Sequence, residues 1–251
     1  EMILAAEKLG LLADNSAEQK IRYPVPVIKT KLNRPPIPPN HIHRPELMER
    51  LRHYRELPFT LISASAGYGK SLLASCWLEK CGMAGSWYSL DDQDNDPLTF
   101  LSHFLAAIES AHPHAVPKTR NLLNAPKLPP ESLIIRSLTN ELEIVEQDFI
   151  LVLDDFHLIR DKWVKNLLTE ILRHPPRSIH LMIICRRDPF LPIATLRARG
   201  QMHEIRSEDM RFSVEETKRY MEQTLAQPVE HNIAAQWTAA TEGWVTGLRL
   251  A

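Results

Sequence analysis

Short, continuous apolar segments alternate with amphipathic ones through the middle of the sequence. The apolar segments predict strands at 58–64, 86–90, 149–153, 178–184 and 201–205, and apolar positions at helical spacing predict helices at 45–56, 71–81, 97–110 and 131–146. Apolar strands separated by helices are typical of a parallel sheet that is covered by helices on both faces. Residues 40–206 are therefore predicted to form an α/β core.

Proline-rich segments interrupt this pattern at two places. Residues 1–39 are expected to hold an amphipathic helix at 2–12, followed by an extended, proline-rich lead-in at 24–39. A second concentration of prolines, at 112–130, predicts a long loop within the core.

Beyond the last predicted strand the sequence becomes helical. Ser213 and Glu216 have the spacing of a capping box, which marks the start of a helix. Two further helices fit residues 230–240 and 243–251. We interpret residues 207–251 as the beginning of a small helical domain that is cut off at its end.

Composition and charge exclude several classes of partner. The chain has 30 basic and 31 acidic residues, so its overall charge provides no field for nucleic acid or an anionic membrane. No apolar stretch approaches the roughly 20 residues that a membrane-spanning helix needs, and no signal-peptide pattern is found. The three cysteines are expected to be reduced thiols. These features predict a cytoplasmic protein with no membrane partner.

Two of the eight glycines lie in the segment ASAGYGKS, at residues 64–71. This segment differs from the phosphate-loop pattern GxxxxGK[ST] only in having Ala64 at the first position. A strand is expected before it and a helix after it, so that backbone N–H groups and the helix N-terminus form an anion cradle. Lys70 is expected to bind the β- and γ-phosphates, and the Ser71 hydroxyl to bind Mg²⁺. The other expected nucleotide contacts are Ala66, Gly67, Tyr68, Gly69 and Leu72.

Two adjacent carboxylates, Asp154 and Asp155, end the most apolar strand. Beside a phosphate loop the natural partner for their charge is Mg²⁺, since a buried strand rarely ends in unpaired carboxylates. We expect Asp154 to hold the metal and Asp155 to orient or deprotonate an attacking water. In isolation such a pair would more often be a solvated loop.

Arg186 and Arg187 follow the fourth predicted strand. Ligands gather at the carboxyl ends of the strands in parallel sheets, so Arg186 is expected to sense or neutralise the γ-phosphate. The alternative, equally favoured for Arg187, is a surface arginine that pairs with Asp188 or Glu204.

Several further segments, in order along residues 30–251, carry a family resemblance. They are TKLNRPP, HIHRPELMERL, WYSLDDQDNDPLTFLSHFLAAI, LVLDDFHLI, ICRRDP, LRARGQMHEIRSEDMRFSVEET and TEGWVTGLRLA. With the phosphate loop, they resemble the ATPase domain of the large MalT-like regulators of the LuxR family, which belong to the STAND class of P-loop NTPases. Wider STAND relatives often carry proline where Val245 stands.

This resemblance implies a fold, a ligand and a mode of action. It implies a P-loop NTPase fold, with Ile42, His43 and Arg44 near an adenine base, and ATP or ADP with Mg²⁺ as ligands. It also implies a switch that rests with ADP, self-associates with ATP and resets by slow hydrolysis. DNA binding would belong to a C-terminal helix-turn-helix domain that is absent from these 251 residues.

Two other functions compete with a regulatory ATPase. One is a metabolic P-loop enzyme such as a small-molecule kinase, although residues from 213 onward lack the dense arginine cluster of a typical lid. The other is a nucleotide-binding scaffold without turnover. A GTPase and a transporter ATPase are disfavoured because the sequence has no NKxD and no LSGGQ-like motif.

Overall fold

A computed structural model describes residues 25–53, 56–125 and 127–250. The strands are β1 (Phe59–Ser63), β2 (Ala84–Ser89), β3 (Phe149–Asp154), β4 (Ile179–Cys185) and β5 (Met202–Arg206). All are parallel and lie in the order β2-β3-β4-β1-β5. The predicted helix at 2–12 falls outside the described residues.

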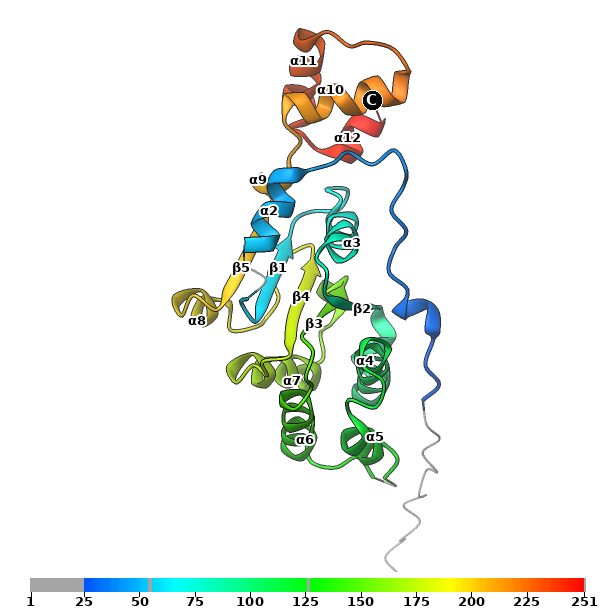
Figure 1. Cartoon of the computed structure of the whole chain (residues 1–251), viewed down its shortest axis with the longest axis vertical. Helices are drawn as coiled ribbons and strands as arrows, with labels where there is room; N and C mark the ends of the chain where they lie inside the picture. Colours follow the sequence, from blue (N-terminus) through cyan, green and yellow to red (C-terminus); the bar gives the residue numbers. More distant parts are fainter. Residues whose placement is uncertain (1–24, 54–55, 126, 251) are drawn as a thin grey trace, which may run out of the picture.

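The helices cover both faces of this sheet, which confirms the predicted fold class (Figure 1). One face packs against α4 (Pro97–Ala111), α5 (Pro117–Leu123), α6 (Glu131–Glu143), α7 (Lys162–Arg173) and α8 (Ile193–Ala198). The other face packs against α2 (Pro45–His53), α3 (Lys70–Lys80) and the short α9 (Ser207–Met210). Alternate residues of each strand enter the two cores, as the pleat requires.

Three helices, α10 (Val214–Leu225), α11 (His231–Thr241) and α12 (Val245–Leu250), stand beyond the carboxyl ends of the strands (Figure 1). The Ser213 hydroxyl accepts a hydrogen bond from the Glu216 amide, and the Glu216 carboxylate accepts one from the Ser213 amide. The expected capping box is therefore present. We refer to residues 211–250 as the helical segment.

The proline-rich lead-in is held against the core. It contains one 3₁₀ turn, η1 (Lys29–Leu32), beside β2 and α4, and then runs along one side of the molecule to α2 (Figure 1). Lys31 of this turn forms ion pairs with Asp91 and Asp94, each at 2.9 Å. Asp94 belongs to a second 3₁₀ turn, η2 (Asp92–Asn95), and a third, η3 (Phe156–Leu158), follows β3.

The prediction of a long loop over 112–130 is wrong, because α5 lies within it. Pro117 occupies the first helical position, where its missing N–H costs nothing. The buried Glu141 carboxylate of α6 accepts hydrogen bonds from the Lys118 and Thr119 amides, at 2.7 and 2.9 Å. The side chain that caps α5 is thus more than twenty positions away, which short-range patterns do not detect.

Candidate nucleotide site

The phosphate loop links the end of β1 to the start of α3. Gly67 and Gly69 have φ angles of 80° and 79°, a left-handed conformation that favours glycine. This explains why two scarce glycines occur within three residues. Gly69 directly precedes α3, so the N-terminus of that helix faces the loop.

Lys70 is the first residue of α3, and its side chain folds back onto the loop. Its ammonium Nζ donates to the Ser65 carbonyl oxygen at 2.8 Å, and the residue is only 8% exposed. Burial lowers the pKa of Lys70, as does the nearby Arg186, while Asp155 and Asp154 oppose the shift. A negatively charged partner would stabilise the charged form of this buried ammonium group.

Asp154 ends β3 and is buried, as the sequence predicts. It accepts hydrogen bonds from the Ser71 side chain and, at 2.9 Å, from the Asp155 amide. Burial raises the pKa of Asp154 to about 6. A hydroxyl beside a buried carboxylate is a suitable partial ligand set for Mg²⁺, whose remaining ligands are commonly phosphates and waters. The two predicted metal ligands are therefore adjacent.

Asp155 adopts a left-handed conformation, with φ 57°, and its carboxylate is half-exposed at the same edge of the sheet. The nearly buried His157 lies with Nδ1 3.7 Å from an Asp155 carboxylate oxygen, and burial lowers the pKa of this imidazole. His157 is not among the site residues predicted from the sequence. Its position three residues after Asp154, in LVLDDFHLI, is the signal that could have pointed to it.

Arg186 directly follows β4, and β4 lies between β1 and β3 in the sheet. Arg186 therefore emerges between the phosphate loop, which follows β1, and the acidic end of β3. Its charge acts on Lys70 and on His157, and its side chain is exposed. The carboxylates considered as alternative partners are taken by other residues: Arg206 pairs with Asp188 and Glu204, and Arg197 also pairs with Glu204.

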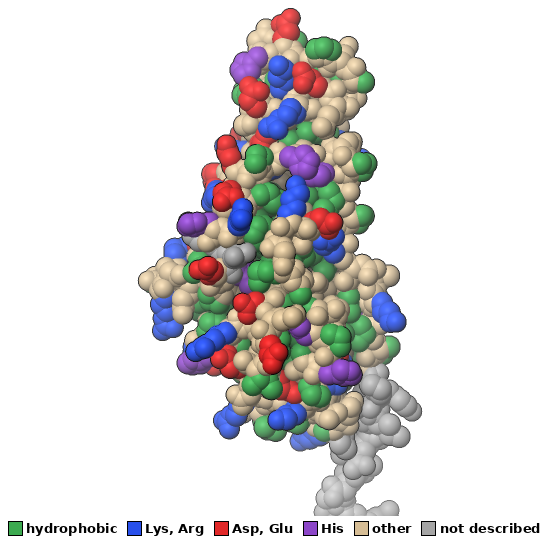
Figure 2. Space-filling model, viewed as in Figure 1, with side chains coloured by type: hydrophobic (Ala, Val, Ile, Leu, Met, Phe, Trp, Pro, Cys, Tyr) green, Lys and Arg blue, Asp and Glu red, His purple; other side chains and the backbone are tan. Residues whose placement is uncertain are grey.

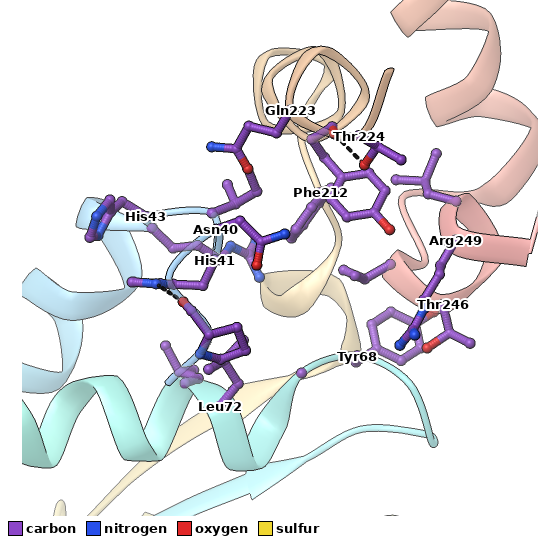
Figure 3. A pocket seen from close by; sticks show the side chains of 18 of the residues that line it. Asn40, His41, His43, Tyr68, Leu72, Phe212, Gln223, Thr224, Thr246 and Arg249 are labelled. Atoms are coloured by element: carbon purple, nitrogen blue, oxygen red, sulfur yellow. Dashed lines mark hydrogen bonds between the residues drawn. The ribbon is translucent and has the colours of Figure 1, made fainter. Parts of the chain in front are cut away.

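A cleft of about 1190 Å³ opens beside the loop, between the core and the helical segment. One wall carries Gly67, Tyr68, Gly69 and Leu72 together with Ile42, His43 and Arg44. Tyr68, Leu72 and His43 are labelled in Figure 3. The opposite wall includes Phe212, Tyr220, Trp237, Thr246 and Arg249. No carboxylate lines this cleft among the residues that the structure describes, whereas its charged side chains are Arg44, Lys80 and Arg249, with His41 and His43 beside them.

The three expected adenine contacts line the cleft in different ways. Ile42 is half-buried and His43 is exposed, with the His41 ring 4.3 Å away. The Arg44 guanidinium is engaged elsewhere: it pairs with Glu216 at 2.9 Å, donates to three backbone carbonyls and lies over the Phe212 ring. Arg44 thus joins the core to the helical segment.

The helical segment supplies a wall that sequence reasoning missed. Phe212, Tyr220, Trp237 and Arg249 come from three different helices and one linker, and no short motif brings them together. Trp244 and Thr246 lie in the stretch GWVTGLRL, whose only signal in the sequence is its family resemblance. Both contact the phosphate loop, as described below.

The fold and this site define the class of protein. A parallel sheet whose β1 leads through a glycine-containing loop into a helix, with a lysine and a hydroxyl at the helix start and an acidic strand end nearby, is a P-loop NTPase. Within the described ranges, no helix is long and apolar enough to cross a membrane.

Known proteins place the chain more narrowly, although no family model matches it. It is 33% identical over 223 residues to the HTH-type transcriptional regulator MalT of Vibrio cholerae, covering 89% of this chain and 25% of that protein. The MalT of Serratia proteamaculans is also 33% identical, over 224 residues and with the same coverage. The chain therefore spans about a quarter of the length of these relatives.

Solved structures agree on the fold. A Signal Transduction ATPase with Numerous Domains (STAND) protein with a tetratricopeptide repeat sensor, from Pyrococcus horikoshii, matches 87% of this chain and 30% of its own, with a TM-score of 0.60 and 17% identity. Cdc6p from Pyrobaculum aerophilum matches 89% of this chain and 61% of its own, with a TM-score of 0.52 and 16% identity. The chain is thus similar to MalT regulators over most of its own length and has the fold of P-loop NTPases, which confirms the resemblance inferred from its motifs.

Proposed function

We propose that this domain binds ATP or ADP with Mg²⁺ and is the nucleotide switch of a transcriptional regulator. Slow hydrolysis of ATP would reset the switch, and the ATP state would favour self-association. DNA would be bound by a domain outside these residues. The observation that carries the proposal is the continuity of the phosphate loop with a cleft whose walls are apolar and whose charged side chains are all basic.

Each part of a nucleotide has a complementary surface there. The apolar and aromatic walls suit a base and a sugar, and the loop amides with Lys70 suit phosphates. Ser71 and Asp154 would hold Mg²⁺, which neutralises phosphate charge when bound. Asp155 would orient or deprotonate the attacking water, and Arg186, whose charge already acts on Lys70, would stabilise charge on the γ-phosphate.

The deciding experiment has a binding arm and a turnover arm. The purified protein is denatured and any released nucleotide is identified by chromatography, and the Kd for ADP with Mg²⁺ is then measured on nucleotide-free protein. Lys70→Ala should weaken ADP binding at least about tenfold, because a charge-assisted contact is lost. Lys162→Ala is the matched control, since Lys162 is an exposed lysine at the start of α7 that does not line the cleft.

In the turnover arm, phosphate release from ATP is compared with that of Asp155→Asn. This variant should keep its ATP affinity and lose turnover by about 100-fold, as expected for loss of a general base. If Lys70→Ala binds ADP as the wild type does, the phosphate-loop assignment is wrong. Binding without phosphate release in the wild type would favour a scaffold, and ADP formation only with an added acceptor would favour a kinase.

A further inference from the structure

The phosphate loop is hydrogen-bonded by the start of α12, whose Thr246 also lines the cleft. The Trp244 indole Nε1 donates to the Ala66 carbonyl oxygen at 2.9 Å. The Gly67 carbonyl oxygen accepts from both the hydroxyl and the amide of Thr246, at 3.0 and 3.2 Å. Two successive loop carbonyls are therefore bound by two residues that follow them by almost 180 positions in the sequence.

The contact is also sterically close. A Cβ atom placed on Gly67 would lie 2.3 Å from the Thr246 hydroxyl oxygen and 2.7 Å from Trp244 Nε1. Position 67 thus needs glycine for two separate reasons, its left-handed backbone and the approach of α12. The helical segment and the loop pack too tightly here for a side chain between them.

Peptide geometry links these contacts to phosphate binding. In a planar trans peptide the carbonyl oxygen and the following N–H point in opposite directions. When Trp244 holds the Ala66 carbonyl, the Gly67 N–H is directed away from α12, and when Thr246 holds the Gly67 carbonyl, the Tyr68 N–H is likewise directed away. These two N–H groups belong to the anion cradle of the loop.

The donors themselves are held in place by the helical segment. The Phe212 amide donates to the Gly243 carbonyl oxygen at 2.9 Å, and Gly243 has a φ angle of 69°. A Cβ atom at position 243 would lie 2.6 Å from the Phe212 carbonyl oxygen. The start of α12 is therefore fixed to the linker that leads out of the core, so movement of the helical segment moves Trp244 and Thr246.

We propose that Trp244 and Thr246 are positioning residues for phosphate binding: they orient the peptide units of the loop so that its N–H groups face the phosphates of the nucleotide. The inference rests on the proposed function. Because coupling between binding events is reciprocal, a nucleotide on the loop also strengthens docking of α12 on the same loop.

The test measures the Kd for Mg-ADP by titration calorimetry on nucleotide-free protein. Thr246→Val keeps the shape and removes the donor, and should weaken binding about fivefold, the effect of one hydrogen bond. Trp244→Phe should have a similar effect through the other carbonyl. Thr246→Ser restores the hydroxyl and should recover most of the affinity. Thr238→Val is the matched control, because its hydroxyl bonds only to the Ala234 carbonyl within α11.

Hydrogen exchange supplies a readout that a merely structural role would not move. ADP should slow exchange in residues 244–250 of the wild type, where the Thr246 amide bonds to the loop, and should slow it less in Thr246→Val. If the wild type binds no nucleotide, the proposed function fails and this inference fails with it. If the wild type binds and Thr246→Val and Trp244→Phe match it, only the positioning role is overturned. Equal losses in Thr246→Ser or Thr238→Val would overturn it as well.

Discussion

A buried ion pair, supported by a tyrosine hydroxyl, joins the lead-in to the core. Lys31 is 9% exposed and Asp94 is fully buried, and the two side chains meet at 2.9 Å. The Tyr88 hydroxyl donates to the same carboxylate at 2.7 Å. The pair fixes the lead-in to the core, since removing one partner would leave an uncompensated buried charge.

His203 is also buried, but burial favours its neutral form and not a charged one. Burial lowers the pKa of this β5 imidazole from 6.5 to about 4. The unfolded chain therefore binds a proton that the folded chain refuses, and stability falls as pH drops from about 6.5 towards 4. In urea unfolding, His203→Gln should flatten this part of the stability profile by roughly 2 kcal/mol.

The matched control is His174→Gln, because His174 is exposed at the end of α7. Its stability profile should follow that of the wild type across the same pH range. A profile of His203→Gln with the wild-type slope between pH 4 and 6.5 would show that another group titrates there.

Helices and strands could be predicted from the sequence where the apolar pattern that specifies them lies within the element itself. The strands and most helices follow from local apolar patterns, and the phosphate loop follows from spacing alone. The strand order does not, because nothing local places β4 between β1 and β3. The far wall of the cleft escapes prediction for the same reason: Phe212, Trp237 and Arg249 meet the loop only through tertiary packing.

Helix α5 tests whether an element can depend on a contact that is distant in the sequence. The Lys118 and Thr119 amides and the Thr119 hydroxyl all bond to the Glu141 carboxylate. Glu141→Ala should lower the free energy of unfolding by about 2 kcal/mol, since hydrogen bonds to a buried charge are lost. In Glu141→Ala, amide hydrogen exchange should become faster in residues 117–123 than in the wild type, and this increase should be larger than in the other helices. The control is Glu143→Ala, whose side chain is partly exposed on the same helix; unchanged protection of α5 would refute the capping role.

At the scale of the molecule, two sets of side-chain contacts join the helical segment to the core within the part of the chain that the structure describes. Arg44 is one, through Glu216, the carbonyls that precede α10 and the Phe212 ring, and the Trp244–Thr246 contact with the loop is the other. Basic and acidic side chains are interspersed on the face shown in Figure 2, so no broad field of one sign steers the docking there. Docking therefore depends on these local bonds.

Arg44→Lys should loosen the helical segment while the sheet stays folded. Lysine keeps the charge but lacks the planar fork that reaches Glu216 and the carbonyls of Met210 and Arg211 together. We expect a larger radius of gyration in small-angle scattering and faster proteolysis within residues 207–213, with ADP reversing both. Arg52→Lys is the control, because Arg52 is exposed on α2, the helix that directly follows Arg44, and its ion pair with Glu49 spans 3.9 Å. Wild-type scattering and cleavage in Arg44→Lys would mean that the loop contact alone keeps the cleft closed.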